Sequence, residues 1–122
     1  MTPEVQRIFR KLEQTASWYG IQVKAVNQKN DLGDTPLHTV CSWGEVPPVE
    51  LLIEAGADVN ARGDRGCTPV FNAVVGESAD VIRALKRFGA SLEIKSVDGR
   101  SVLEYARNVG SSREVLEALA PR

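Results

Sequence analysis

Short stripes of apolar residues with helical spacing recur along the chain. In residues 3–19 the apolar side chains are three or four positions apart, which predicts an amphipathic helix that begins at Pro3. The residues on its apolar side are Val5, Ile8, Phe9, Leu12 and Ala16. At the end of the same segment, Trp18 and Tyr19 are expected to pack this helix against the rest of the chain.

A Thr-Pro pair introduces each of two later apolar helices. Thr35 and Thr68 are predicted to cap the helix N-termini through their hydroxyls, and the proline that follows each takes the first helical position, where no N–H is needed. Gly44 and Gly76 are predicted to end these helices as left-handed C-terminal caps. The apolar residues are Leu37, Val40 and Cys41 in the first helix, and Val70, Phe71, Ala73 and Val74 in the second.

Further helices are predicted after Pro47–Pro48, after Ser78, and after Ser111, which has the spacing of a capping box with Glu114. Gly56 and Gly89 close the first two of them. All of the predicted elements are helices joined by turn-rich loops, so the expected fold class is all-α.

The helices recur with a period of 33 residues. The hexapeptide at 33–38, Gly-Asp-Thr-Pro-Leu-His, aligns with 66–71, Gly-Cys-Thr-Pro-Val-Phe, and with 99–104, Gly-Arg-Ser-Val-Leu-Glu. Independently, Gly-Ala-Asp-Val-Asn at 56–60 aligns with Gly-Ala-Ser-Leu-Glu at 89–93. Two separate landmarks with one period indicate a solenoid of stacked helical units.

The string Asp-Thr-Pro-Leu-His at 34–38, followed by Val-Glu-Leu-Leu-Ile-Glu-Ala-Gly-Ala-Asp-Val-Asn-Ala at 49–61, closely resembles the ankyrin-repeat pattern. The resemblance covers residues 25–119 and implies helix-loop-helix units with projecting hairpin loops, in about three repeats plus an N-terminal capping helix. We expect a single domain over residues 1–122. Its parts would be a capping helix and loop at 1–32, repeats at 33–65 and 66–98, and a C-terminal capping repeat at 99–122.

Composition and charge fit an ordinary small globular domain. Of 122 residues, 43% are hydrophobic and 25% are charged, and 15 Lys and Arg against 16 Asp and Glu leave no field that favours nucleic acid. No segment approaches the roughly 18 apolar residues of a membrane span, and the charged N-terminus has no signal-peptide core. Two cysteines are too few for a disulfide framework, so we expect a cytoplasmic protein.

Few residues offer chemistry. His38 is the single histidine, and the resemblance implies that its ring nitrogens tie neighbouring loops. The sequence shows no metal-ligand spacing and no phosphate-binding loop, so no metal, cofactor or catalytic residue is expected. Cys41 is expected to be buried, whereas Cys67 lies near Arg65 just before a helix N-terminus, a setting that can lower a thiol pKa.

The ankyrin resemblance implies that hairpin tips and inner helices line a concave, partner-binding surface. We expect Trp43 to be a hot spot there, with partial burial against a neighbouring loop as an equally weighted alternative. The predicted partner-binding residues are Asp34, Ser42, Trp43, Asp64, Arg65, Val75, Asp98, Arg100, Arg107 and Asn108.

The predicted function is a non-enzymatic protein–protein interaction module that is monomeric when free and binds another protein. Its architecture is also similar to that of small bacterial ankyrin proteins that act as inhibitors or immunity proteins for a toxin. Two alternatives remain open: a small thiol-dependent enzyme or redox protein that uses Cys67, and a self-associating structural unit.

Overall fold

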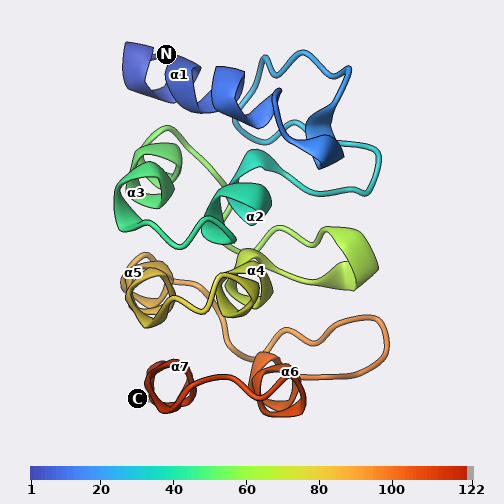
Figure 1. The fold of residues 1–122 in the computed structure, drawn as a ribbon, viewed down its shortest axis with the longest axis vertical. Helices are drawn as coiled ribbons and strands as arrows, with labels where there is room; N and C mark the ends of the chain where they lie inside the picture. Colours follow the sequence, from blue (N-terminus) through green and yellow to red (C-terminus); the bar gives the residue numbers. More distant parts are fainter. Residues whose placement is uncertain (121–122) are drawn as a thin grey trace.

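The computed structural model describes residues 1–120 and arranges them as a stack of helix pairs with loops projecting to one side (Figure 1). Helices α2, α4 and α6 form an inner column, and α3, α5 and α7 form an outer column beside it. The elements are α1 (Pro3–Leu12), a 3-10 turn (Ala16–Trp18), α2 (Pro36–Cys41), α3 (Val46–Glu54), a 3-10 turn (Asp64–Gly66), α4 (Pro69–Val75), α5 (Ala79–Arg87), α6 (Val102–Asn108) and α7 (Arg113–Ala118). The all-α prediction is confirmed.

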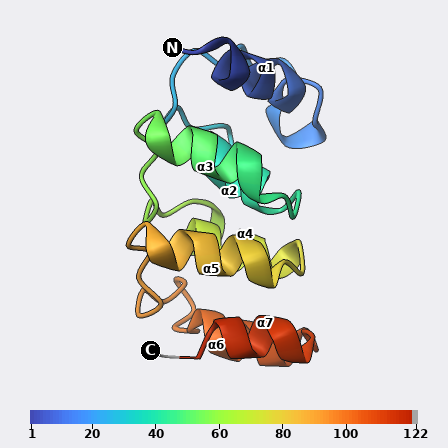
Figure 2. The ribbon, with the colours of Figure 1, turned by 90° about the vertical axis from the view of Figure 1, so that its left-hand side faces the viewer.

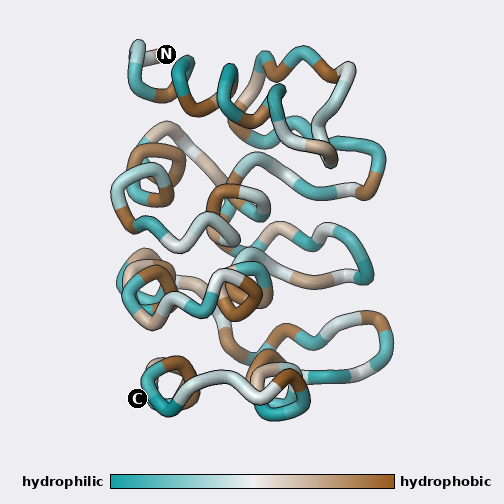
Figure 3. Tube along the Cα trace, in the orientation of Figure 1, coloured by the Kyte–Doolittle hydropathy of each residue, from teal (hydrophilic) through white to brown (hydrophobic). Residues whose placement is uncertain are grey.

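Stacking of equivalent helices buries one continuous core. Figure 2 shows the outer helices lying side by side, and α1 covers α2 and α3 at the N-terminal end of the stack. Hydrophobic positions face the helix interfaces, whereas the projecting loops are mostly hydrophilic (Figure 3). Each repeat buries its apolar side on its neighbour, which is how a chain of this size obtains a core. The largest fully buried side chains are Trp18, Phe9, Leu12, Leu37, Leu52, Ile82 and Leu85.

The N-terminal helix is shorter than predicted. It ends at Leu12, whose carbonyl accepts a hydrogen bond of 2.6 Å from the Thr15 hydroxyl, and the chain then turns into a 3-10 segment that leaves Ala16 exposed. Trp18 is fully buried and its indole N–H donates to the Thr39 hydroxyl at 2.9 Å, which confirms its packing role. Tyr19 is 85% exposed, so the same prediction for Tyr19 is wrong.

The end of α4 differs from the predicted left-handed glycine cap. Gly44 has a φ of +79°, as predicted, but Gly76 has a φ of −76° and the next residue, Glu77, takes the left-handed φ of +51°. Gly76 is required for another reason, since a Cβ there would lie 2.8 Å from the Ser42 carbonyl oxygen. The Glu77 carboxylate accepts hydrogen bonds from the Ser111 hydroxyl at 2.7 Å and the Ser112 N–H at 3.2 Å. Glu77 therefore links repeats two and three.

Two other predicted helix starts shift by a few residues. Helix α3 begins at Val46, so both prolines lie within its first turn rather than before it. The N-cap of α7 is Ser112, whose hydroxyl accepts from the Val115 N–H, and not Ser111. The predicted Ser78 cap is confirmed, because its hydroxyl accepts from the Val81 N–H at 3.1 Å.

The two Thr-Pro starts are not equivalent. The Thr35 hydroxyl lies 2.9 Å from Nδ1 of His38. The Thr68 hydroxyl is buried without a hydrogen-bond partner among residues 1–120, so its predicted capping role is wrong. The Thr68 hydroxyl lacks a partner because Phe71 occupies the position that His38 has in the first repeat, and a phenyl ring offers no hydrogen bond.

We therefore expect Thr68→Val to leave the free energy of unfolding unchanged or to raise it by up to about 1 kcal/mol. The substitution keeps the shape and removes a buried polar atom that has no partner. The matched variant Thr35→Val should lower stability by about 1–2 kcal/mol, because it removes a hydroxyl that contacts His38. Urea denaturation measures both, and an equal loss in the two variants would contradict the assignment.

Candidate functional site: a concave groove beside the hairpin loops

Backbone hydrogen bonds close each projecting loop. Three N–H groups donate across the loop bases: Asn30 to Asp34 O at 2.9 Å, Gly63 to Cys67 O at 2.8 Å, and Ser96 to Arg100 O at 3.0 Å. Neighbouring loops are also linked, because the Val97 N–H donates to Arg65 O at 2.9 Å. The loops therefore form a connected rim rather than independent flaps.

His38 fixes the first two repeats together. The Thr35 N–H donates to Nδ1 at 3.0 Å, so the ring proton lies on Nε2, which is 2.9 Å from the Cys67 carbonyl oxygen and donates to it. Burial lowers the pKa of His38 despite the opposing effects of the Cys67 carbonyl and Asp34. The imidazole is thus a neutral connector between loops, as the family resemblance implied.

Asp34 makes a second link between the first and second loops. Its carboxylate accepts a hydrogen bond of 2.9 Å from the Asp64 N–H in the next loop. In the third loop the Ser96 hydroxyl donates to the Asp98 carboxylate. This hydrogen bond and the charge of Arg100 hold the pKa of Asp98 below its usual range. These carboxylates help to shape the loops as well as facing solvent.

The loops and inner helices enclose a groove on the concave side, which we call the concave groove. It consists of two adjoining hollows of about 240 and 80 Å³ that share Arg65, Cys67, Phe71 and Tyr105. The rings of Phe71 and Tyr105 lie 5.8 Å apart at an angle of 47°. The first hollow is completed by Asp34, Asp64, Asn72 and Val75, and the second by Ser96, Asp98 and Arg100.

The structure brings together several residues that the sequence predicted for a partner site. Asp34, Asp64, Arg65 and Val75 line the first hollow, and Asp98 and Arg100 join Arg65 in the second. Val75 is 61% exposed at the C-terminal end of α4. Nothing in the fold tests their role in binding, which stays a prediction.

The other four predicted residues do not line the concave groove. Ser42 occupies the position of Val75 one repeat earlier, but its hydroxyl donates to the Thr39 carbonyl at 2.6 Å. Asn108 holds the same position in α6 and is exposed. Arg107 occupies the position of the buried Cys41 and Val74, so it belongs to the face that would stack on a further repeat.

Trp43 lies in a different groove, beside the turns that join inner and outer helices. It is half-buried and packs against the core, so the alternative of partial burial describes its environment better than an exposed concave position. The ammonium of Lys11, from α1, lies 4.9 Å from the centre of the indole ring.

Sequence reasoning missed the aromatic floor of the concave groove. Tyr105 and Asn72 occupy equivalent positions, four residues after Ser101 and Thr68, so the 33-residue period could have placed both beside the loops. The apolar pattern places Phe71 in the core, and its side chain is 3% exposed, yet it also lines the hollow.

The thiol of Cys67 is not activated. Burial raises its pKa, and the nearby carboxylates of Asp64, Asp98 and Asp34 raise it further, against the opposing effect of Arg65. The position near Arg65 and a helix N-terminus can lower a thiol pKa, but burial and the acidic loops outweigh the one guanidinium here. Burial also raises the pKa of the Cys41 thiol. Neither cysteine has the low pKa that a nucleophilic thiol requires.

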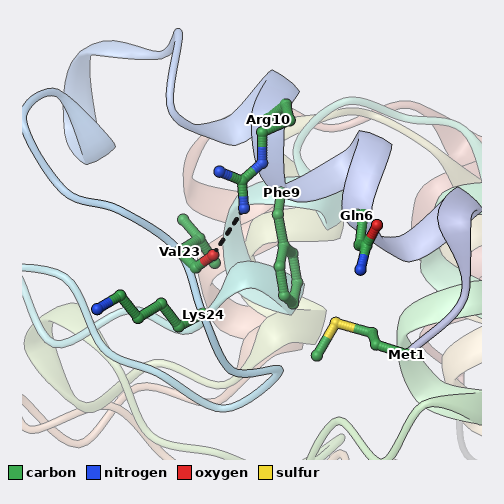
Figure 4. A pocket seen from close by; sticks show the side chains of 6 residues that line it. All are labelled: Met1, Gln6, Phe9, Arg10, Val23 and Lys24. Carbon is green, nitrogen blue, oxygen red and sulfur yellow. Dashed lines mark hydrogen bonds between the residues drawn. The ribbon is translucent and has the colours of Figure 1, made fainter.

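A separate hollow of about 390 Å³ lies on the N-terminal cap (Figure 4). Its floor is formed by Phe9 and Val23, which are 1% and 0% exposed. The Arg10 guanidinium donates to the Val23 carbonyl at 3.0 Å and lies 3.1 Å from the Glu13 carboxylate, so it ties α1 to the following loop. Met1, Gln6 and Lys24 complete the rim.

Two further features of residues 1–120 bear on other functions. No group of three or more His, Cys, Asp or Glu side chains is placed to hold a metal ion. None of the helices in this part of the chain is long and apolar enough to cross a membrane.

Comparison with known proteins gives a consistent result. A family model described as ankyrin repeats (3 copies) matches residues 11–96. The chain is 37% identical over 82 residues to mouse ankyrin repeat and SOCS box protein 11, covering 67% of this chain and 25% of that protein. It is 33% identical over 93 residues to BRCA1-associated RING domain protein 1 of Caenorhabditis elegans, covering 75% of this chain and 13% of that protein. It is 33% identical over 81 residues to human BCL-6 corepressor-like protein 1, covering 66% of this chain and 4% of that protein.

The chain spans a quarter or less of each of these three relatives, at 25%, 13% and 4% of their lengths. The matched range includes residues predicted as the N-terminal cap and ends before the predicted C-terminal repeat at 99–122. The boundaries of the individual repeats therefore stay predictions.

Proposed function

The chain belongs to the ankyrin-repeat family, whose repeats generally mediate protein–protein interaction, and from this premise we propose that it binds a partner protein in the concave groove with Arg65 at the centre of the contact. The observation that carries the proposal is the backbone of Arg65. Its φ is +58°, in the left-handed region, where a side chain costs about 1–2 kcal/mol relative to a relaxed conformation.

Glycine would remove that strain, so an arginine at this position calls for a compensating role. The side chain lines both hollows of the concave groove, is exposed, and forms no ion pair within residues 1–120. A free guanidinium next to an aromatic floor can make paired hydrogen bonds to a partner carboxylate and stack on an apolar side chain. Arg100 is less available, because it lies 3.8 Å from the Asp98 carboxylate.

Arg65→Gly separates stability from binding. We expect the variant to be more stable than the parent by about 0.5–1 kcal/mol, since glycine accepts this backbone conformation without strain. We expect it to bind a partner about 10- to 100-fold more weakly, as for an interface hot spot. The measurements are urea denaturation, and titration calorimetry with a partner recovered by the parent chain from native lysate.

Arg113→Ala is the matched control, because Arg113 is 87% exposed on α7, away from the concave groove. It should change neither quantity. A partner that binds the parent and the Arg65→Gly variant equally well would remove Arg65 from the interface. Retained affinity after Arg65→Gly, Tyr105→Ala and Val75→Asp together would reject the concave groove as the binding site.

We propose further that the chain acts as a free monomer in the cytoplasm, and that one form of this function is inhibition of a toxin. Support comes from the concave groove, which presents a charged rim and an aromatic floor to a protein partner. Co-expression with the product of a neighbouring toxin gene should restore growth, and Arg65→Gly should abolish the rescue. Sedimentation equilibrium separates this proposal from self-association, which would appear as a concentration-dependent mass.

A further inference from the structure

A second groove lies on the edge of the stack where inner helices turn into outer helices. We call it the Trp43 groove and define it by Trp43, Glu77, Asp80, Arg83 and Glu114, which line a hollow of about 510 Å³. It shares no residue with the concave groove, so a function of this surface is independent of the function proposed above.

Trp43 is not required there by the repeat. The equivalent residues are Gly76 and Val109, one and two periods later. Gly76 has to be small because a Cβ would lie 2.8 Å from the Ser42 carbonyl oxygen. The indole ring thus stands beside a closely packed turn with a side open to the groove. Its N–H donates no hydrogen bond within residues 1–120, in contrast to that of Trp18.

The ring already holds a cation. The Lys11 ammonium lies 4.9 Å from the ring centre, within the range of a cation–π interaction. Lys11 is exposed, so this contact is formed in water and is worth little to the fold. The contact shows that a protonated amine reaches the face of Trp43 without obstruction.

Carboxylates outnumber cations in the groove. Its lining includes three carboxylates, those of Glu77, Asp80 and Glu114, and one guanidinium, that of Arg83. Arg83 lies 3.5 Å from Asp80, and both side chains are exposed, at 49% and 83%. The side chain of Glu114 makes no ion pair or hydrogen bond within residues 1–120. An acidic hollow with an aromatic wall favours cations and repels phosphate groups.

We propose that the Trp43 groove binds a basic segment of a partner protein, with one Lys or Arg side chain on the indole ring in place of Lys11 and a neighbouring cation at Glu114. The partner cation gains the ring face and the carboxylates together, whereas Lys11 reaches only the ring. Nucleic acids and anionic membranes are excluded by the same carboxylates. Because Lys11 lies over the Trp43 ring in the free chain, it competes with the partner cation for that contact.

The test uses a rhodamine-labelled hexa-arginine peptide with blocked ends, titrated with the full chain at about 50 mM salt, where surface charges are little screened. Fluorescence anisotropy gives the dissociation constant. Lys11→Ala should tighten binding by about 2- to 5-fold, because it removes the competitor for the ring. Trp43→Leu should weaken binding by about 2- to 5-fold through loss of the cation–π contact.

Matched carboxylates on one helix provide the sharpest comparison. Glu114→Gln should weaken peptide binding by about 2- to 5-fold, and Glu117→Gln, on α7 outside the groove, should leave it unchanged. Both residues are exposed, so these two variants keep the fold even if Trp43→Leu does not. Arg65→Gly should not alter peptide affinity, so failure of the concave-groove proposal and failure of this one are distinguishable.

Three results would overturn the proposal: equal effects of Glu114→Gln and Glu117→Gln, unchanged or weaker binding after Lys11→Ala, or equal binding of a hexa-glutamate peptide. Concentration-dependent dimerisation that Trp43→Leu abolishes would assign the groove to a second copy of the chain and would also overturn it.

Discussion

Replacing His38 with alanine is expected to lower the free energy of unfolding by about 3–4 kcal/mol. The imidazole is fully buried, so its removal leaves a cavity. It also leaves the Thr35 N–H and the Cys67 carbonyl without the partners that they have at 3.0 and 2.9 Å. Urea denaturation followed by circular dichroism at pH 7.5 measures the loss.

The control is the equivalent position two periods later. Glu104 is exposed and forms a capping box with Ser101, whose N–H donates to its carboxylate at 2.8 Å. Glu104→Ala should therefore cost only about 1 kcal/mol. Similar losses in the two variants would mean that His38 acts as an ordinary cap and does not join two repeats.

The same residue should make stability depend on pH. Burial holds the pKa of His38 in the folded chain below its ordinary value of 6.5, so the unfolded chain binds the proton first as pH falls. The full contribution is present above pH 6.5, and stability should decrease on acidification by at most about 1.4 kcal/mol per pH unit. His38→Ala should flatten the profile between pH 6.5 and 5, above the range in which carboxylates titrate. An unchanged slope would contradict the neutral, buried imidazole.

The repeat period predicted the architecture because it reflects stacking, which each unit repeats in the same way. Thr35, Pro36 and His38 predict a helix start from local sequence alone, and the structure has a helix that begins there with Thr35 as its N-cap. Local signals failed where a neighbouring repeat decides the outcome. Gly76 looks like a left-handed cap, yet it is small because the Ser42 carbonyl approaches it, and Glu77 takes the left-handed conformation instead.

The candidate site shows the same division. The loop residues Asp64, Arg65 and Asp98 were predictable from their place in the period, and they lie in the concave groove. Arg107 and Trp43 lie one residue before and one residue after the repeat position that Val75 occupies at the end of its inner helix. Such a shift turns a helical side chain by about 100°, enough to move it from one surface to another. The left-handed φ of Arg65 has no sequence signal of its own.

Gly63→Ala is the second substitution for which we expect a large effect, a loss of about 3 kcal/mol or more. Gly63 has a φ of −112°, so it does not adopt the left-handed conformation that favours glycine. The reason is space: a Cβ would lie 2.8 Å from Nε2 of His38 and would collide with the Asp34 carboxylate. Relief of the overlap would break the links of His38 to Cys67 and of Asp34 to Asp64.

The period explains why only this repeat carries the constraint. The equivalent residues are Asn30 and Ser96, and the residues facing Ser96 in place of Asp34 and His38 are Cys67 and Phe71. A glycine with open space around it, Gly20, has a φ of +80°, and Gly20→Ala should cost about 1 kcal/mol from backbone strain alone. In an Asp34→Ala background, Gly63→Ala should cost less than it does alone, because one of the two colliding groups is gone. Equal costs in both backgrounds would show that the carboxylate of Asp34 does not press against Gly63.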